Sequence, residues 1–376
     1  MPKQFLICIL QHRNVSFSVT AFFHLHAALK DRSDLQKKIK IVFACTGRNL
    51  IALKNIKNTY STLYDIDVFE CDGEYTKKID AILSYYLASQ YEYFVKHDED
   101  VFVSPPSWVA LLDSAPQVLA ESKNLLLSVN LSTGIPSWSR FLGLFFTPKE
   151  QRLVAAKLAL SALPNECWGN NYQYLNQQIA ARDVWDEDAY WNDVNGLGYD
   201  YRGIHPVRLD IWYANYLNKK IISNYQNFLE HSVDHEVTKI DDRYFCNSFF
   251  CMDYRQYRDI WNNKSLFVDP FDEVPINRYA VLNNLDICFI EDSLAIHIIY
   301  NSVYGQKVLI DDQFCDGRKL EQYFLRQYFN GICEYLALDP VLFDVAQKGI
   351  LRNLRIKLKR AIAQFSLDLY QRYYWP

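Results

Sequence analysis

The chain has 376 residues, of which 50% are apolar and 22% charged, and its net charge at pH 7 is −4. A disordered protein is less apolar and a general nucleic-acid binder has a basic surface, so this balance argues against both classes. The length suits one large α/β domain with an extension, or two domains. No apolar run reaches the length of a membrane span, and the run at residues 5–10 is too short for a secretory signal.

Nine cysteines are scattered along the chain without an obvious disulfide framework. Cys246 and Cys251 form the closest pair, with C-x4-C spacing, which is a weak metal signal when no second pair is nearby. Free thiols are usual in the reducing cytoplasm. We therefore expect a cytoplasmic protein.

The first part of the chain alternates apolar, β-prone runs with segments of helical periodicity. We expect strands at residues 5–10, 40–45, 67–71, 93–96 and 125–131. Helices are expected at 18–29, 49–59, 77–90 and 105–120. Such alternation predicts a parallel sheet covered by helices on both faces, with ligands beyond the carboxyl ends of the strands.

The later part of the chain has a different pattern of apolar and aromatic residues. Residues 147–237 are mostly helical and rich in aromatic residues, which suggests an insertion. Strands follow at 244–252, 285–290 and 295–300, with helices up to residue 261 and at 275–285. We divide the chain into a nucleotide-sugar-binding α/β half (1–146), the helical insertion (147–237), an acceptor and catalytic half (238–340) and a C-terminal amphipathic helix (341–376).

An acidic cluster, His97-Asp98-Glu99-Asp100, lies between two apolar runs. On an extended chain Asp98 and Asp100 point the same way, so the pair can hold one hard divalent cation, whereas Glu99 should point away and tolerate replacement. A solvated acidic turn is the plainer interpretation. The predicted strand end favours the cation.

A second acidic pair, Asp272-Glu273, precedes a helix whose first turn contains Pro275. Acids at this place are favoured by the helix dipole. Capping accounts well for one acid but less well for two. The pair is therefore also a candidate for base, nucleophile or sugar-hydroxyl acceptor.

The order of these two motifs resembles the layout of GT-A glycosyltransferases. More narrowly, residues 272–279 (DEVPINRY) resemble the D-E-S-H-L-N-K-Y segment of the retaining α-1,3-galactosyl and ABO blood-group transferase family. Val274 and Pro275 replace the serine and histidine of that segment. The identical positions are Asp272, Glu273, Asn277 and Tyr279.

The resemblance implies a Rossmann-type mixed sheet flanked by helices, within an α/β fold. It also implies that Asp98 and Asp100 hold Mn²⁺ or Mg²⁺ on the donor diphosphate. Asp272 would bind donor-sugar hydroxyls. Glu273 would be the nucleophile or stabilise the oxocarbenium-like transition state in a retaining reaction, which we favour over an inverting one.

Further residues match the family only by position. The loop after the first strand and the one after the third would meet the nucleotide, and solvated loops are the alternative; the candidates are Gln11, His12, Arg13 and Asp72. His297, within an apolar strand, is either a core residue or the third metal ligand. A rival D-x-D at residues 186–188 looks helical, so its segment is a candidate acceptor site with Trp185, Asp188 and Trp191.

The C-terminal segment 348–372 has seven basic residues and one acidic residue. Its apolar residues follow helical spacing, which suits either a helix docked on the acidic body or an interfacial helix on an anionic membrane.

Together these features predict a metal-dependent glycosyltransferase at the inner membrane face. It would move a sugar from a UDP-sugar to a glycan, free or lipid-linked, in surface polysaccharide synthesis; nucleic acid is not an expected partner. A nucleotidyltransferase or phosphohydrolase is the alternative, although residues 11–18 lack the glycine-rich loop of the former. A non-catalytic nucleotide-sugar-binding module is the third possibility.

Overall fold

A computed structural model describes the arrangement of most of the chain. The described residues are 3–47, 49–71, 73, 75–132, 145–150, 211–240, 247–263, 273–298, 300, 305–310 and 313–343. The predicted insertion therefore lies largely outside the described residues, and so does nearly all of the predicted C-terminal helix.

Within the described residues, eight strands form one mixed sheet in the order β3-β2-β1-β4-β8-β6-β9-β7. The pairs β3–β2, β2–β1, β1–β4 and β6–β9 are parallel, whereas β8 runs antiparallel to both β4 and β6. The strands are β1 (Phe5–Leu10), β2 (Ile39–Cys45), β3 (Asp65–Glu70), β4 (Tyr93–Asp98), β6 (Asn124–Ser128), β7 (Val237–Ile240), β8 (Phe249–Asp253) and β9 (Asp286–Ile290).

The mixed α/β sheet is confirmed, and the simpler expectation of a wholly parallel sheet is wrong because β8 and β7 enter it antiparallel. The strands β1, β2, β3, β4, β6 and β9 all end at the same edge, which we call the carboxyl edge. Strands from both predicted halves of the chain belong to this one sheet.

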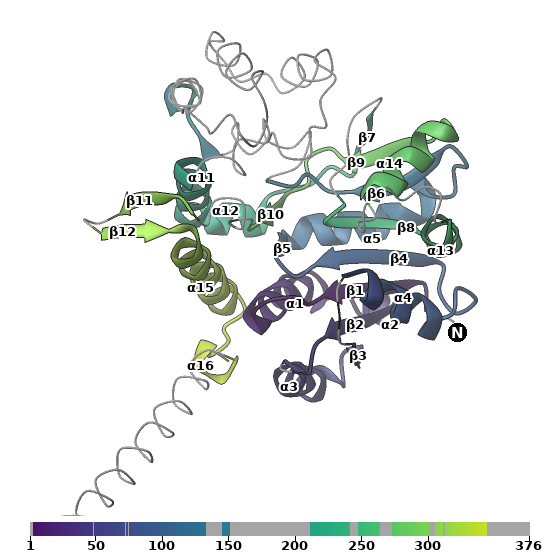
Figure 1. Ribbon diagram of the computed structural model, residues 1–376, viewed down its shortest axis with the longest axis horizontal. Coiled ribbons are helices and arrows are strands. Elements are labelled where there is room, and N and C mark those ends of the chain that lie inside the picture. Colours follow the sequence, from purple (N-terminus) through teal and green to yellow (C-terminus); the bar gives the residue numbers. More distant parts are fainter. Residues whose placement is uncertain are drawn as a thin grey trace, which may run out of the picture.

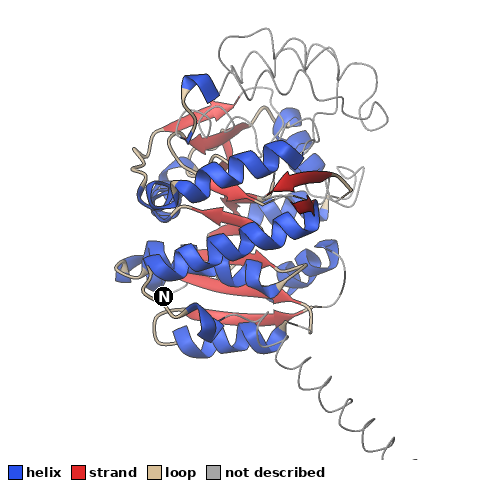
Figure 2. Ribbon diagram, turned by 90° about the vertical axis from the view of Figure 1, so that its left-hand side faces the viewer, coloured by secondary structure: helices blue, strands red, loops and turns tan. Residues whose placement is uncertain are grey.

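Helices cover both faces of the sheet (Figures 1 and 2). One face carries α1 (Val15–Leu29), α3 (Leu50–Tyr60) and α5 (Pro105–Val118), whose apolar residues form a single core with alternate residues of β1 and β2. The other face carries α4 (Tyr75–Tyr85), α13 (Tyr254–Asn262) and α14 (Glu273–Leu282), packed on the opposite residues of the same strands. Alternation explains the two cores, because neighbouring side chains on a strand point to opposite faces.

Local sequence explains where these helices begin. Asn14 caps α1 by accepting a hydrogen bond from the Ser16 N–H, and Ser104 caps α5 with Pro105 in the first turn. Pro at that position lacks an N–H that the helix would leave unpaired anyway. These two helices thus follow closely on β1 and on a short strand, β5 (Val101–Val103), respectively.

Two smaller sheets and a second group of helices complete the described structure. Strand β5 (Val101–Val103) pairs antiparallel with β10 (Ala295–His297), and β11 (Lys307–Ile310) forms a hairpin with β12 (Gln313–Asp316). The helix α15 (Gly317–Tyr335) packs along α1 (Figure 1), where Phe23 and Phe329 stack. The remaining helices are α2 (Ser33–Lys38), α11 (Ile211–Ser223), α12 (Tyr225–Glu230) and α16 (Pro340–Phe343).

Within the described ranges, none of the helices is both long enough and apolar enough to cross a bilayer.

Candidate functional site

The site forms where the loop after β1 meets the turn after β4 at the carboxyl edge. Strand β4 ends at Asp98, and Glu99 and Asp100 make the turn into β5. The argument that Asp98 and Asp100 share a face of one extended strand therefore fails beyond Asp98. The two carboxylates acquire different partners, which come from other parts of the chain.

Glu99 ties the turn to the loop after β1. Its Oε1 accepts hydrogen bonds from the backbone N–H groups of His12 (2.8 Å) and Arg13 (2.5 Å), and its Oε2 accepts one from the Ser18 hydroxyl (3.3 Å). Burial, helped by the charge of Asp100, raises the pKa of Glu99 to about 8. Glu99 is 2% exposed and its carboxylate accepts three hydrogen bonds, so it is not a solvated member of an acidic turn, and its tolerance to replacement stays a prediction.

Asp100 is buried, and its two carboxylate oxygens each contact a nitrogen atom of another side chain. Its Oδ2 lies 2.5 Å from Nη2 of Arg13, and its Oδ1 lies 3.5 Å from Nε2 of His297. Although burial by itself raises the pKa of Asp100, the His297 imidazole and the Arg13 guanidinium hold that pKa well below its usual range. Asp100 is therefore a carboxylate at neutral pH.

The register of the small sheet brings His297 to this place. His297 is paired with Val101, the residue after Asp100, and its backbone N–H donates to the Ser132 hydroxyl (2.9 Å). The side chain is 4% exposed. The prediction that His297 joins the acidic cluster thus agrees with its position, although its role as a metal ligand stays a prediction.

Arg13 connects the acidic turn to α15. Its Nη1 lies 2.7 Å from Oε1 of Glu321, while Nη2 holds Asp100. Glu321 is buried on α15 and was not predicted from the sequence. In the sequence, Glu321 is recognisable only as an acidic residue within the apolar stripe of a helix, beside Leu320 and Phe324.

Asp98 pairs with Lys96, two residues earlier on β4. The ammonium of Lys96 lies 3.2 Å from Oδ1 of Asp98, donates to the carbonyl of Asn247 (2.6 Å) and lies 4.9 Å from the centre of the Tyr75 ring. Lys96 is 1% exposed, whereas the Asp98 side chain is 23% exposed. Asp98 is accordingly the more accessible of the two aspartates.

Gln11 and His12 follow β1, as expected, but their side chains differ in exposure. Gln11 is fully buried; its amide donates to the carbonyl of Arg13 (2.8 Å) and accepts from the N–H of Thr46 (3.4 Å). His12 is exposed, and its ring lies beside Tyr75. Gln11 therefore shapes the loop that carries Arg13, and His12 is the one that faces outward.

The donor set at Asp100 and His297 suits a divalent cation. Neighbouring ligands of an octahedral Mg²⁺ lie roughly 3 Å apart, close to the 3.5 Å between these two atoms. Among the described residues no three His, Cys, Asp or Glu side chains converge as a metal cluster. A cation that is shared with a diphosphate needs only one or two protein ligands, because phosphate oxygens and water supply the rest.

The second acidic motif is only partly described. Glu273 is the first residue of α14, which thus begins two residues before the predicted helix, and Ile276 and Ala280 pack that helix on the sheet. A short turn joins α14 to β9, so the helix and the strand run in opposite directions and the start of the helix lies on the side of the carboxyl edge. The other predicted site residues lie outside the described residues: Asp72, Asp272, Trp185, Asp188 and Trp191.

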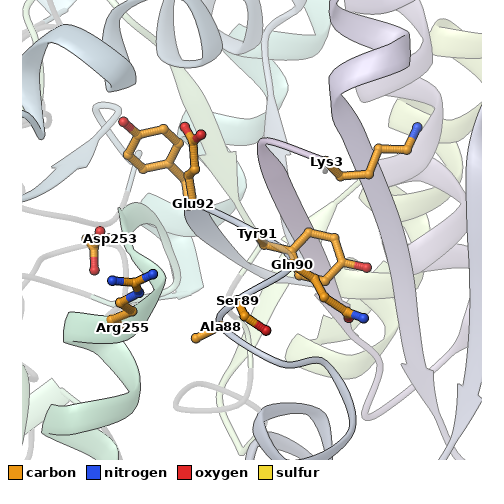
Figure 3. Close-up of a pocket in the computed structure, with 9 residues that line it drawn as sticks. Lys3, Ala88, Ser89, Gln90, Tyr91, Glu92, Asp253 and Arg255 are labelled. Carbon is orange, nitrogen blue, oxygen red and sulfur yellow. The ribbon is translucent and has the colours of Figure 1, made fainter. Parts of the chain in front are cut away.

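A separate hollow of about 360 Å³ lies at the opposite edge of the sheet, near the starts of β1 and β4 (Figure 3). Its lining includes the charged residues Lys3, Glu92, Asp253 and Arg255. None of the predicted site residues that the structure describes lines it, so this hollow is distinct from the site at the carboxyl edge.

No protein-family model matches the chain, and no curated protein matches it. Solved structures do. GalNAc-T7 with UDP, GalNAc and Mn²⁺ is 11% identical over 100% of this chain and 59% of its own, with a TM-score of 0.39. The mannosyltransferase PcManGT from Pyrobaculum calidifontis, in complex with GDP-Man and Mn²⁺, is 13% identical over 60% and 66% of the two chains (TM-score 0.28).

The 4-diphosphocytidyl-2C-methyl-D-erythritol synthase of Anaerococcus prevotii DSM 20548 is also similar, at 11% identity over 51% of this chain and 83% of its own (TM-score 0.25). Glycosyltransferases are thus among the neighbours, and so is a synthase of another kind. At identities of 11–13%, the chemistry of this chain has to come from its own residues.

Proposed function

We propose that this protein is a metal-dependent glycosyltransferase of the GT-A type that uses a nucleotide-sugar donor, in the first place a UDP-sugar. The observation that carries the proposal is the convergence of Asp100 and His297, which are far apart in the sequence, at the carboxyl edge of the sheet. Ligands of open α/β sheets bind at that edge. The motif at residues 272–279 supplies the second element of the resemblance.

The residues of the site divide the work as follows. Asp100 and His297 would hold Mn²⁺ or Mg²⁺, and the more exposed Asp98 would contact the donor or the cation. A cation bound there would neutralise the charge that develops on the leaving diphosphate. His12 and Arg13, on the loop after β1, would face the nucleotide, with Gln11 supporting that loop.

The acid pair of α14 would act on the sugar. Asp272 would bind donor-sugar hydroxyls, and Glu273 would be the nucleophile or stabilise the positive charge of the transition state in a retaining reaction. The product's anomeric configuration, determined by NMR, distinguishes retention from inversion and hence the role of Glu273.

The acceptor is proposed to be a glycan, free or lipid-linked, in surface polysaccharide synthesis. Trp185, Asp188 and Trp191 are the candidate acceptor residues, and the basic segment 341–376 would hold the enzyme at an anionic inner membrane face. Co-sedimentation with anionic vesicles tests the last point: the full chain should pellet and a chain without residues 341–376 should not.

The decisive experiment replaces both aspartates. The variant Asp98→Asn/Asp100→Asn should lose about 100-fold or more of its turnover in a screen of nucleotide sugars with Mn²⁺, because charge stabilisation of the leaving group contributes at least that much. Slow donor hydrolysis and sugar transfer are both measured. The control is Asp259→Asn, which removes an exposed carboxylate on α13.

Unchanged turnover in the double variant, with Asp259→Asn equally active, would refute the metal–diphosphate site. Supplied with a nucleoside triphosphate and a sugar phosphate, a protein that instead released pyrophosphate and joined the nucleotidyl group to the sugar phosphate would be identified as a nucleotidyltransferase.

A further inference from the structure

Arg13 lies between two buried carboxylates that come from different parts of the chain. Nη2 is 2.5 Å from Asp100, and Nη1 is 2.7 Å from Glu321 on α15. The two carboxylate side chains are 7% and 5% exposed, whereas that of Arg13 is 32% exposed. One guanidinium therefore serves two partners through different nitrogen atoms, and breaking one contact leaves the other intact.

The position of Arg13 conflicts with a cation at the same carboxylate. A divalent ion on Asp100 and His297 would bring a second positive charge against the guanidinium, and the protein around Asp100 screens that repulsion poorly. Arg13 also fills the Oδ2 side of Asp100. The cation and the guanidinium thus compete for one carboxylate.

The backbone around Arg13 is fixed, so only its side chain has freedom to respond. Its N–H donates to Glu99 (2.5 Å), and its carbonyl accepts from the side-chain amides of Gln11 (2.8 Å) and Asn49 (3.2 Å). The guanidinium itself lies 5.7 Å from the centre of the Phe17 ring, an aromatic surface that attracts a cation.

We propose that Arg13 is the counter-ion of Asp100 in the cation-free protein, and that a divalent cation displaces it from Asp100 while Glu321 retains it. Arg13 then sets the affinity of the site for the cation, and Glu321 couples α15 to cation binding. This inference rests on the metal site of the proposed function.

Direct binding of Mn²⁺ to the full chain tests the proposal, measured by titration calorimetry without any nucleotide. Arg13→Gln removes the competitor and should tighten Mn²⁺ binding about tenfold, within the range usual for coupled sites. Glu321→Gln removes the alternative partner and should weaken Mn²⁺ binding several-fold. A merely structural role of Arg13 predicts weaker binding in both variants, so the opposite signs identify competition.

Two further variants serve as controls. Arg13→Lys keeps the positive charge, so its affinity for Mn²⁺ should stay within about threefold of that of the unaltered chain. Arg255→Gln removes a charge at the opposite edge of the sheet and should not change the affinity. Should Arg13→Gln fail to fold, Glu321→Gln alone decides, because unchanged or tighter binding in that variant refutes the proposal.

The outcome also separates this inference from the proposed function. If Asp100→Asn abolishes Mn²⁺ binding but Arg13→Gln leaves it unchanged, the role of Arg13 is refuted and the metal site stands. If Asp100→Asn binds Mn²⁺ as the unaltered chain does, the metal site is refuted and the role of Arg13 with it.

Discussion

Glu99 is buried, although its position in a run of acidic residues suggests an exposed side chain. It sits between two aspartates, yet it is the residue that fastens the turn after β4 to the loop after β1. Its hydrogen bonds fix the backbone from which Arg13 reaches Asp100. The neighbours of an acidic motif can thus hold its geometry without touching a ligand.

Replacing Glu99 by Ala should lower the free energy of unfolding by about 2 kcal/mol, because two backbone N–H groups lose their acceptor near the protein interior. Urea denaturation at pH 7 measures the change. Glu99→Gln keeps an acceptor oxygen and should lose less, and Glu334→Ala, on the exposed side of α15, should change little. A Glu99→Ala protein as stable as the unaltered chain would show that the loop holds without this contact.

The element that matters most beyond the sheet is α15. It packs along α1, and it places Glu321 against Arg13. Its start is fixed by Asp316, whose carboxylate accepts a hydrogen bond from the Lys319 N–H (2.9 Å). Weakening this helix start therefore weakens the support of the site.

Asp316→Ala should lower the free energy of unfolding by about 1 kcal/mol, the usual cost of a lost N-cap. Asp316→Asn retains an oxygen that accepts the same hydrogen bond and should remain close to the unaltered chain. Thermal or urea unfolding compares the two variants. Equal losses in both would mean that the charge of Asp316, and not its capping bond, stabilises α15.

At the scale of the whole molecule, a buried histidine connects α1 to the helices on that face. His24 is fully buried; its Nδ1 lies 3.1 Å from the carbonyl of Val103 and its Nε2 2.7 Å from the hydroxyl of Tyr225. Burial lowers the pKa of His24 to about 3. The folded protein thus keeps this imidazole neutral at every pH above about 3.

Stability should therefore fall as the pH drops below about 6.5, because the unfolded chain takes up a proton on His24 that the folded chain refuses. The slope for one such group is about 1.4 kcal/mol per pH unit, or about 2 kcal/mol between pH 6.5 and pH 5. Urea denaturation at pH 7, 6 and 5 measures it. The variant His24→Gln should show a shallower dependence by that amount.

The control for pH is His235→Asn, at an exposed position whose φ of 59° suits asparagine. Its urea denaturation is measured at the same three pH values for comparison. A His24→Gln protein with an unchanged slope would assign the acid sensitivity to other groups.

The sequence by itself determined the strands and helices around the core and the position of the acidic cluster. Runs such as residues 5–10 and 39–45 are apolar because both of their faces are buried, and that composition is visible without a structure. The strand before the acidic cluster, predicted at 93–96, and the helix after the second acidic motif, predicted at 275–285, followed from the same local patterns, and the structure extends them to Asp98 and Glu273 respectively. The pairing of strands that are distant in the sequence has no such local signal, so the antiparallel position of β8 was not predicted.

Only the tertiary structure decided which groups meet at the site. Local alternation predicted a common face for Asp98 and Asp100, but the turn at Glu99 separates them. Asp98 therefore pairs with Lys96, and Asp100 pairs with Arg13. The contact of Arg13 with Glu321 joins residues 308 positions apart. Such pairs depend on how helices dock on the sheet, which is set by packing over the whole core and not by the residues next to each partner.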